Sequence, residues 1–437
     1  MPPVQSVAGM RDLLPAEMAT WTRLFRVAAQ LCEQRGYQPI VTPVLEHTEV
    51  FAHGVGVGTD IVDKEMYTFE DKGGRSLSLR PEATASAVRA YFEGGLNQGP
   101  QPTRLWYEGP MFRYDRPQKG RYRSFRQFGI EAIGDDTPEL DAEVIELASA
   151  WLRRCGIEDV TLEVNSLGDA RCRPGYRQAL RDYYRPHLAE LCEDDRRRFE
   201  TNPLRLLDCK KPQCQPFQES APRTIDHLCE ECAAHHARVL AALDGLEIGY
   251  HQNHRLVRGL DYYTRTAFEY WDPGHGGQQN ALGGGGRYDG LAEVLGFRPT
   301  PGVGFAMGED RVVLALQEAG RAEPELPPHA TIIPAAAGSG PLAMRLAADL
   351  RGGGLRVVVQ HGTRSLKAQM RQAQKLGAPI ALILGEDEVA AGEVTVRDMR
   401  RSEQTRLRQD AVRTEVPKIM AIAAADHRSQ EGGWAKA

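Results

Sequence analysis

The sequence predicts an α+β fold, in which an antiparallel sheet flanked by helices is followed by a separate α/β unit. Up to about residue 320, short β-branched segments and helical segments follow one another without regular β-α alternation, which disfavours a doubly wound parallel sheet. Residues 320–328 contain three prolines and few apolar side chains, which is typical of a linker. Beyond residue 330, strand-like and helix-like segments alternate. We therefore expect two domains, residues 1–325 and 326–437.

The elements of the first domain follow from apolar spacing. Trp21, Leu24 and Leu31 recur at helical intervals, so the segment 18–32 predicts an amphipathic helix. A β-branched segment broken by two prolines comes next, followed by a glycine-rich loop. From 170 to 249 the composition shifts to Arg, Glu and Cys, which predicts a mostly helical insertion. Further helices are expected at 84–92 and 140–155, and strands at 104–107, 160–164, 267–271 and 302–307.

The sequence of the second domain predicts a regular alternation of strands and helices. Ser365 is a suitable N-cap for its second helix, and Gly377 is a suitable residue to end that helix. We expect helices at 341–350 and 365–377, a last helix near the end, and strands at 330–335, 356–360, 380–385 and 393–398. About 110 residues is an ordinary domain size.

Bulk composition excludes several classes of protein. Of the 437 residues 41% are hydrophobic and 26% charged, as in globular domains, and no apolar run approaches the roughly 18–20 residues that span a bilayer. The first residues do not resemble an export signal. The eight cysteines are few for a disulfide framework. We therefore expect a cytoplasmic protein with mostly reduced thiols and no membrane contact.

Charge is distributed unevenly between the two domains. The net charge is −5, but residues 330–437 carry 16 Lys and Arg against 11 Asp and Glu, a net +5, so the preceding part carries −10. A basic terminal domain on an acidic body suits contact with a polyanion. A solvated charged surface explains the charge equally well.

The segment 104–126 is the first that carries chemistry. It has seven basic residues against two acidic ones, with aromatic residues interleaved, and the turn sequence PQKG predicts a hairpin. Guanidinium groups clamp phosphate oxygens and aromatic faces stack on bases, so we interpret the segment as a nucleotide or nucleic-acid site. A solvated charged hairpin is the alternative.

Two later segments add to this site hypothesis. Residues 256–271 place an Arg-Gly pair, an Asp and two tyrosines just before a strand. Four glycines at 283–286 permit close approach of the backbone to a ligand, and Arg311 lies at the start of an expected helix.

Taken together, these segments resemble the class II aminoacyl-tRNA synthetases and, within that class, the histidyl-tRNA synthetase family, over nearly the whole chain. GMRDLLP at 9–15 is similar to the family's start, GYQPIVTPVLEHTEVF at 36–51 to the dimer-forming motif around Pro43, LRPEATASAVRAY at 79–91 to the segment that receives the substrate's amino group, FRYDRPQKGRYR at 112–123 to the second class II motif, RGLDYYTRTAFEY at 258–270 to a histidine-specific signature, and GVGFAMGEDR at 302–311 to the third motif.

The resemblance implies ATP-dependent activation of L-histidine to histidyl-adenylate and transfer to the 3′ end of tRNA(His). The implied catalytic residues are Arg113, Arg258 and Arg311. The implied ATP-binding residues are Arg113, Asp115, Arg121, Arg123 and Arg311, with Asp115 standing where Glu is common. The implied histidine-binding residues are Glu82, Ala83, Thr84, Arg113, Gln127, Glu131, Arg258, Tyr262 and Tyr263. Arg116 and Gln118 are implied to contact the acceptor end of tRNA, including the extra 5′ guanosine of histidine tRNAs.

The resemblance also implies a homodimer, an anticodon-binding role for residues 326–437, and Mg²⁺ carried by ATP. Glu131 has a second reading, as a surface ion-pair partner of Arg126. The spacing of Cys209, Cys214, Cys229 and Cys232 is compatible with one tetrahedral zinc site, although free structural thiols are the favoured reading.

Two rival functions stay open. The regulatory subunit of ATP phosphoribosyltransferase shares the core, but usually lacks the C-terminal domain and has a degraded RGLDYYTRT segment, and both are present here. A prolyl- or threonyl-tRNA synthetase is the second rival, and the tyrosine pair after Arg258 and Gly259 argues against it.

Overall fold

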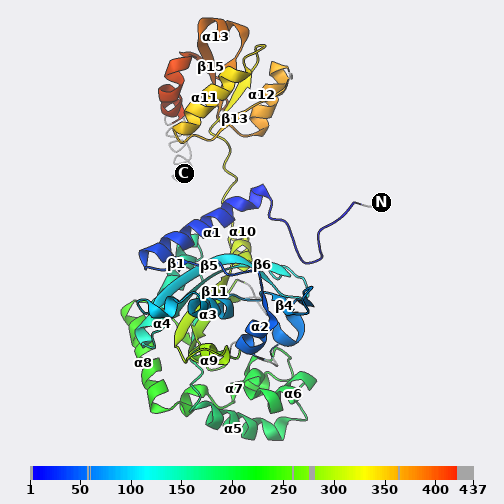
Figure 1. Cartoon of the computed structure of the whole chain (residues 1–437), viewed down its shortest axis with the longest axis vertical. Helices are drawn as coiled ribbons and strands as arrows, with labels where there is room; N and C mark the ends of the chain where they lie inside the picture. Colours follow the sequence, from blue (N-terminus) through cyan, green and yellow to red (C-terminus); the bar gives the residue numbers. More distant parts are fainter. Residues whose placement is uncertain are drawn as a thin grey trace, which may run out of the picture. The chain divides into compact units, whose positions relative to one another are not determined.

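The computed structural model of the chain describes residues 3–56, 59, 61–257, 260–274, 281–362 and 365–420 (Figure 1). The chain forms two compact units, Met1–Pro324 and Glu325–Ala437. Among the described residues, no helix is long and apolar enough to cross a membrane.

The first unit is organised around one large sheet. Among the described residues it has eight strands in the order β1-β5-β6-β11-β10-β9-β7-β8. All neighbours pair antiparallel except at the two edges, where β1–β5 and β7–β8 are parallel. The bounds are β1 (Gln38–Pro39), β5 (Thr103–Phe112), β6 (Ser124–Ile133), β7 (Thr161–Ser166), β8 (His251–Gln252), β9 (Thr264–Trp271), β10 (Ala281–Arg287) and β11 (Gly302–Gly308). The expected antiparallel sheet with flanking helices is confirmed.

Helices and a small second sheet surround this sheet. The small sheet has the order β2-β4-β3, with β2 (Leu45–His47), β3 (Thr68–Glu70) and β4 (Ser76–Leu79). The helices of the body are α1 (Pro15–Gln34), α2 (Thr48–Val55), α3 (Thr84–Glu93), α4 (Pro138–Cys155), α9 (Leu291–Val294) and α10 (Glu309–Glu318). Between β7 and β8 lie α5 (Arg173–Tyr184), α6 (Glu193–Thr201), α7 (Pro216–Glu219) and α8 (Glu230–Gly245), so the region expected to be helical is helical.

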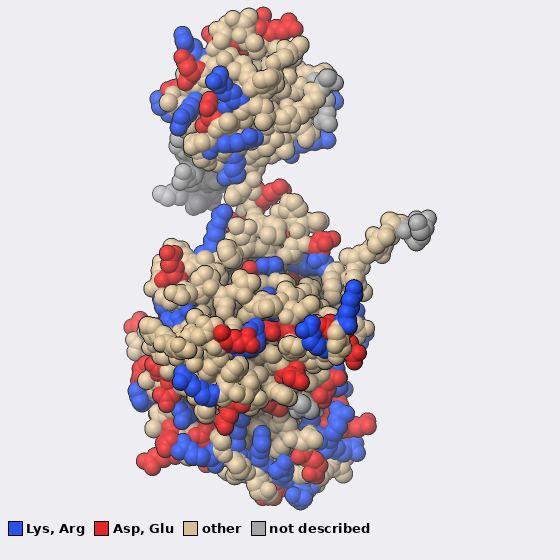
Figure 2. Space-filling model, in the orientation of Figure 1, with Lys and Arg blue, Asp and Glu red and all other residues tan. Residues whose placement is uncertain are grey.

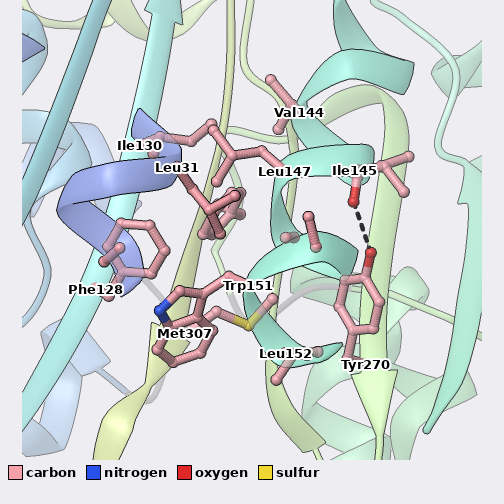
Figure 3. Packing of buried hydrophobic residues seen from close by; sticks show 14 of the residues in the cluster. Leu31, Phe128, Ile130, Val144, Ile145, Leu147, Trp151, Leu152, Tyr270 and Met307 are labelled. Atoms are coloured by element: carbon pink, nitrogen blue, oxygen red, sulfur yellow. Dashed lines mark hydrogen bonds between the residues drawn. The ribbon is translucent and has the colours of Figure 1, made fainter. Parts of the chain in front are cut away.

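The two faces of the main sheet have different roles because side chains alternate along each strand. On β6, Phe128 and Ile130 pack with Trp151 of α4 in a core that also includes residues of α1 and α10 (Figure 3). Tyr270 of β9 joins this core and donates a 2.8 Å hydrogen bond to the carbonyl of Ile145. The intervening β6 residues, Gln127 and Glu131, therefore project from the opposite face, where the candidate site lies.

A buried ion pair fixes the end of β10 next to that site. Arg287 and Asp141 of α4 are both 0% exposed, and Arg287 Nε lies 3.1 Å from Asp141 Oδ2. Arg287 also donates to the carbonyl oxygens of Asp135 and Thr137. The buried guanidinium thus has a carboxylate and two carbonyl oxygens as acceptors, which a charge needs when it is removed from water. The pair holds the following residue, Tyr288, in position.

The second unit is a small α/β domain. Its sheet has the order β13-β12-β14-β15-β16, parallel around β12 and antiparallel from β14 to β16. The bounds are β12 (Ala330–Pro334), α11 (Gly340–Gly352), β13 (Val357–Val359), α12 (Leu366–Lys375), β14 (Ile380–Leu384), α13 (Glu386–Ala391), β15 (Glu393–Asp398) and β16 (Gln404–Arg408). The expected alternation is confirmed up to β15, whereas α13 and β16 were not predicted.

Both predicted ends of α12 are present. Ser365 is its N-cap and accepts a 3.4 Å hydrogen bond from the amide of Ala368, and Gly377 has a positive φ of 66° just beyond the helix.

Replacing Ser365 with Ala is expected to destabilise the first turn of α12 by about 0.5–1 kcal/mol, the lower part of the usual range, because the capping bond is long. Amide hydrogen exchange should speed up in the first turn of α12 and stay unchanged in α11. Ser365→Asp restores the acceptor and is the matched control. Equal exchange rates in Ser365→Ala and the wild-type chain would remove the capping role.

Candidate functional site

A cavity of about 280 Å³ opens on the face of the main sheet opposite α4. Strands β6, β10 and β11, the amino end of α3 and the β5–β6 hairpin all contribute to it. Its lining includes nine of the residues expected from the sequence: Glu82, Thr84, Arg113, Asp115, Arg121, Gln127, Tyr262, Tyr263 and Arg311. These residues span 230 positions of sequence, so only the fold brings them together.

Glu131 is the centre of a buried polar cluster beside the cavity. Its side chain is 0% exposed and accepts hydrogen bonds from Thr84 Oγ1 at 2.8 Å, Tyr107 Oη at 3.1 Å and Tyr288 Oη at 2.5 Å. Burial raises the pKa of Glu131 to about 8, although the hydroxyl donors act in the opposite direction. A carboxyl group held this way can accept a hydrogen bond from a donor on a ligand when that donor replaces one of the hydroxyl groups.

The alternative reading of Glu131 as a surface ion-pair partner is wrong, because the residue is fully buried. Arg126 instead forms ion pairs with Glu108 and, at 3.9 Å, with Glu309.

Two glycines provide the space that this cluster occupies. Gly304 lies opposite Glu131 in the β11–β6 register, and a Cβ at Gly304 would come within 2.1 Å of Glu131 Oε2. Gly129 lies opposite Tyr107, and a Cβ there would come within 2.4 Å of Tyr107 Oη. Both distances are far below van der Waals contact, so any larger residue at either position displaces the polar cluster.

Glu82 closes the amino end of α3. Its buried carboxylate accepts the backbone amides of Thr84 at 2.6 Å and Ala85 at 3.0 Å. Burial raises the pKa of Glu82, and these two amides act against that rise. The carboxylate lines the cavity, so it can bind a cation such as an ammonium group.

Four arginines line the other part of the cavity: Arg113, Arg121 and Arg126 from the region of the β5–β6 hairpin, and Arg311 from α10. Arg113 donates to the carbonyl of Pro81 at 2.9 Å and lies 5.2 Å from the centre of the Phe125 ring. Arg311, near the start of α10, donates to the carbonyl of Ala281 at 2.5 Å.

The arginines repel one another in the absence of an anion. Burial lowers the pKa of Arg311, and the nearby positive charges of Arg121 and Arg113 lower it further. Arg121 forms ion pairs with Asp115 and, at 3.8 Å, with Glu65. Such a concentration of positive charge suits a polyphosphate.

The remaining wall offers unsatisfied polar groups and aromatic faces. Among the described residues, Gln127 Oε1 is buried and has no hydrogen-bond donor. The rings of Tyr262 and Tyr263 lie 4.7 Å apart, and Tyr262 meets Tyr288 edge to face at 5.9 Å. A buried acceptor without a donor is costly, which indicates that a ligand supplies one.

Several expected site residues lie elsewhere. Arg123 does not line the cavity, because its guanidinium stacks 3.9 Å above the Tyr114 ring and donates to the carbonyl of Asp115. Arg116 and Gln118 are exposed in the hairpin turn, and Ala83 is buried next to Thr84 without lining the cavity. Arg258, expected to be catalytic, lies outside the described residues.

Sequence reasoning missed three members of the site. Tyr107 and Tyr288 both donate to Glu131, and Glu269 lines the cavity. Tyr107 and Glu269 lie inside segments singled out for their chemistry, and Tyr288 closely follows the glycine run at 283–286, but nothing in the local pattern distinguishes these residues from their neighbours. The one available signal was the alternation of side chains along the strands, which indicates the residues that share the sheet face of Glu131.

The four cysteines that were a candidate for one zinc site, with free thiols the favoured interpretation, do not form a single cluster. The structure divides them, because Cys209 and Cys214 lie with Cys192 and Asp195, whereas Cys229 and Cys232 lie with Cys172 and Asp169. The fold of the insertion separates the two pairs.

Comparison with known proteins gives concordant results. The family model described as histidyl-tRNA synthetase matches residues 9–312, and the model described as anticodon binding domain matches residues 329–419.

Similar proteins span nearly the whole chain. A histidine–tRNA ligase of Pelotomaculum thermopropionicum is 49% identical over 405 residues, which cover 92% of this chain and 95% of the relative. One of Desulforudis audaxviator is 51% identical over 401 residues, covering 91% and 95%. The crystal structure of apo histidyl-tRNA synthetase from S. aureus superposes with a TM-score of 0.79 at 36% identity, covering 95% of this chain and 100% of that one.

Proposed function

Because the chain belongs to the histidyl-tRNA synthetase family, we propose that its cavity binds histidine next to ATP and joins them into histidyl-adenylate. The chain is an aminoacyl-tRNA synthetase with the activity of a histidine–tRNA ligase. One observation supports the location of the chemistry more than any other. A single cavity holds a cluster of arginines beside a wall of carboxylate, amide and phenol groups.

The polar wall suits the two ends of histidine. The Glu82 carboxylate is placed for the α-ammonium group at the amino end of α3. An imidazole has one donor and one acceptor when neutral, and Glu131 with Tyr262 or Tyr263 can satisfy both. Gln127 Oε1, which has no donor among the described residues, completes the set. A site of this kind rejects apolar side chains, because they leave its buried polar groups unpaired.

The arginines suit the phosphates. A histidine carboxylate oxygen attacks the α-phosphorus, the bond to the β-phosphate oxygen breaks, and pyrophosphate leaves. Both reactants are negatively charged, so fixed guanidinium groups from Arg113 and Arg311 stabilise the charge that develops in the transition state. We propose Arg258 as a third group on the α-phosphate. Mg²⁺ bound to ATP would supply further positive charge to the phosphates.

The reaction then needs tRNA. The terminal ribose hydroxyl of tRNA(His) attacks the carbonyl carbon of the adenylate, and AMP leaves. Residues 329–419 match an anticodon-binding model, and we propose that this unit contacts the anticodon. Its net positive charge supports this, and Figure 2 shows Lys and Arg side chains spread among acidic ones on its visible face. tRNA and ATP are cytoplasmic, so we expect the enzyme to act there.

ATP–pyrophosphate exchange with each amino acid in turn tests the substrate. Histidine alone should stimulate exchange. Stimulation by proline or threonine in its place would reassign the site to another class II synthetase. A complete lack of exchange, whichever amino acid is added, would favour the regulatory subunit of ATP phosphoribosyltransferase.

Replacing Arg116 with Ala is expected to raise the KM for tRNA about tenfold and leave pyrophosphate exchange unchanged. The side chain is exposed in the hairpin turn outside the cavity, and arginine is the usual reader of guanine. The variant should also lose the preference for tRNA that carries the extra 5′ guanosine.

Steady-state aminoacylation with both tRNA forms provides the measurement. Arg75→Ala, in the exposed turn between β3 and β4, is the control for general loss of positive charge. An unchanged preference for the guanosine in Arg116→Ala would contradict the assignment.

We also propose a homodimer formed through the segment that resembles the family's dimer motif. In the single chain, Val41 is 90% exposed and Leu45 43%, an unusual exposure for apolar residues close together. Sedimentation of the wild-type protein should give twice the 48.4 kDa of one chain, and Val41→Asp should shift it toward one chain at micromolar concentration. Leu326→Asp, which changes an exposed residue at the start of the second unit, should leave the dimer intact. A monomeric wild-type protein would refute the proposal.

A further inference from the structure

The helical insertion between β7 and β8 contains two separate clusters of sulfur and carboxylate groups. The first consists of Cys192, Asp195, Cys209 and Cys214, and the second of Asp169, Cys172, Cys229 and Cys232. In each cluster one potential ligand atom from every residue lies within 4.8 Å of the others. Six of the eight cysteines of the chain are thus gathered into two sites of the same composition.

The distances between sulfur atoms match those around a tetrahedral metal ion. A zinc–sulfur bond of about 2.3 Å places two sulfur ligands of a tetrahedron about 3.8 Å apart. Cys192 Sγ lies 3.8 Å from Cys209 Sγ, and Cys172 Sγ lies 3.7 Å from Cys229 Sγ. A disulfide needs about 2.05 Å, so these cysteines are free thiols that are spaced as metal ligands.

The first cluster, which we call the inner site, is sealed from water. All four of its residues are buried, and Asp195 is 0% exposed. One carboxylate oxygen of Asp195 lies 3.4 Å from Arg198, whereas Oδ2 is buried and has no hydrogen-bond donor among the described residues. A buried carboxylate oxygen without a donor is expensive in free energy, and coordination by a cation removes that cost.

Backbone amides support the sulfurs of the inner site. The amide of Asp195 donates to Cys192 Sγ at 3.4 Å, and the amide of Cys192 donates to Cys214 Sγ at 3.3 Å. Such donors orient a thiolate and lower its charge density, the usual role of groups around metal ligands. The inner site ties the start of α6 to the segment between α6 and α7.

The second cluster, which we call the base site, closes the insertion where it leaves and re-enters the body. Asp169 Oδ1 lies 3.3 Å from Cys172 Sγ, just after β7, and Cys229 and Cys232 lie at the start of α8. The other oxygen of Asp169, Oδ2, accepts a 2.8 Å hydrogen bond from Arg171. One oxygen is thus directed to the sulfur cluster while its partner is held by a cation, as in metal sites whose carboxylate ligand is itself hydrogen-bonded.

We propose that the insertion binds two Zn²⁺ ions, one in the inner site and one in the base site, each through three cysteine thiolates and one aspartate oxygen. Zinc prefers tetrahedral coordination by thiolate, imidazole and carboxylate, and four protein ligands leave no open position. Both ions therefore have a structural role. Each thiol releases its proton on binding, and no ligand changes oxidation state.

The ions explain how this small region holds its shape. Helices α5, α6 and α7 lie together at one end of the first unit (Figure 1), and α7 has only four residues. The base site joins residues 57 positions apart, and the inner site joins Cys192 to Cys214 across 22 positions. Closing loops of this length with a metal removes much of the freedom of the unfolded chain.

Metal analysis of the full-length protein, purified without chelators, tests the proposal. We expect about two zinc ions per chain, and about one in Cys209→Ser and in Cys229→Ser, with essentially none when both changes are combined. Cys155→Ala is the matched control, because Cys155 is a buried cysteine of α4 outside both clusters, and it should keep two ions. Wild-type protein without zinc, with all eight thiols reacting in denaturant, would overturn the proposal.

A second measurement covers variants that fold poorly. Treating the wild-type chain with a mercurial thiol reagent in the presence of a chromogenic zinc indicator should release about two zinc ions per chain. Protein in which Co²⁺ replaces zinc should show thiolate-to-cobalt charge-transfer absorption, reduced by about half in Asp195→Asn or Cys229→Ser. Absence of both signals would refute the sites. Neither readout depends on aminoacylation, so failure here is distinguishable from failure of the proposed function.

Discussion

Replacing Arg113 with Ala is expected to lower histidine-dependent ATP–pyrophosphate exchange about 10³-fold. Its guanidinium lines the cavity together with that of Arg311 and donates a hydrogen bond to the carbonyl of Pro81, which positions it. We assign this guanidinium to the phosphates of ATP. Removing one preplaced charge from a transition state of this kind typically costs on the order of 10²–10³ in rate. The loss should appear mainly in kcat, because the charge develops during the reaction.

Arg123→Ala separates a role in the cavity from general charge. Arg123 belongs to the same hairpin and was expected from the sequence to bind ATP, but it stacks on Tyr114 outside the cavity. Its replacement should lower exchange by much less than that of Arg113, and circular dichroism should show that both variants fold. Equal losses of exchange in the two variants would indicate that activity depends on the positive charge of the whole hairpin and not on the position of Arg113 in the cavity.

Replacing Glu131 with Gln is expected to lower kcat/KM for histidine about 10²-fold and to flatten the dependence of stability on pH. The carboxylate is the buried acceptor for Thr84, Tyr107 and Tyr288, and we propose it as the partner of the imidazole. An amide keeps the shape but has one acceptor oxygen in place of two, so a donor on the substrate and the three hydroxyl groups cannot all be accepted.

The pH effect has a defined sign. Burial raises the pKa of Glu131 from its ordinary 4.5 to about 8, so the folded protein binds the proton more tightly than the unfolded chain. The stability associated with this proton is complete below pH 4.5 and is lost as the pH rises toward 8. The shift corresponds to at most about 5 kcal/mol, and the hydroxyl donors that turn toward the charge lessen it.

Thermal unfolding between pH 5 and 9 measures this effect in the first unit. The midpoint of Glu131→Gln should fall less with pH than that of the wild-type protein. Glu108→Gln is the control, because Glu108 is a carboxylate on the adjacent strand that is paired with Arg126. A steeper fall in Glu131→Gln would show that Glu131 is ionised and stabilising in the folded protein.

Much of the fold followed from local pattern. Apolar spacing located α1, because Trp21, Leu24, Ala28 and Leu31 recur at helical intervals and are all buried. Helices α3 and α4 were also located. Strand β16 was missed because four of its five residues are exposed and it has no apolar alternation, so its conformation depends on pairing with β15. The two-residue edge strands β1 and β8 are likewise defined only by their partners.

The site was predictable in its membership but not in its contacts. Family resemblance indicated Glu131, whereas its bonds to Tyr107 and Tyr288 depend on the register between strands, which no local pattern contains. The cysteines illustrate the same limit. Spacing along the chain suggested one site from Cys209 and Cys229, but these two lie in different clusters once Cys192 and Cys172 are brought in by the fold.

The glycines at 129 and 304 have a consequence for how this enzyme tolerates change. They carry no functional group, yet the room for Glu131 and Tyr107 exists only because their cross-strand neighbours lack a Cβ. The shape of the proposed histidine site thus depends on the lack of a side chain at these two positions as well as on the polar groups themselves. Selection of active clones from a library randomised at these two positions should return glycine almost as strictly as it returns the carboxylate itself.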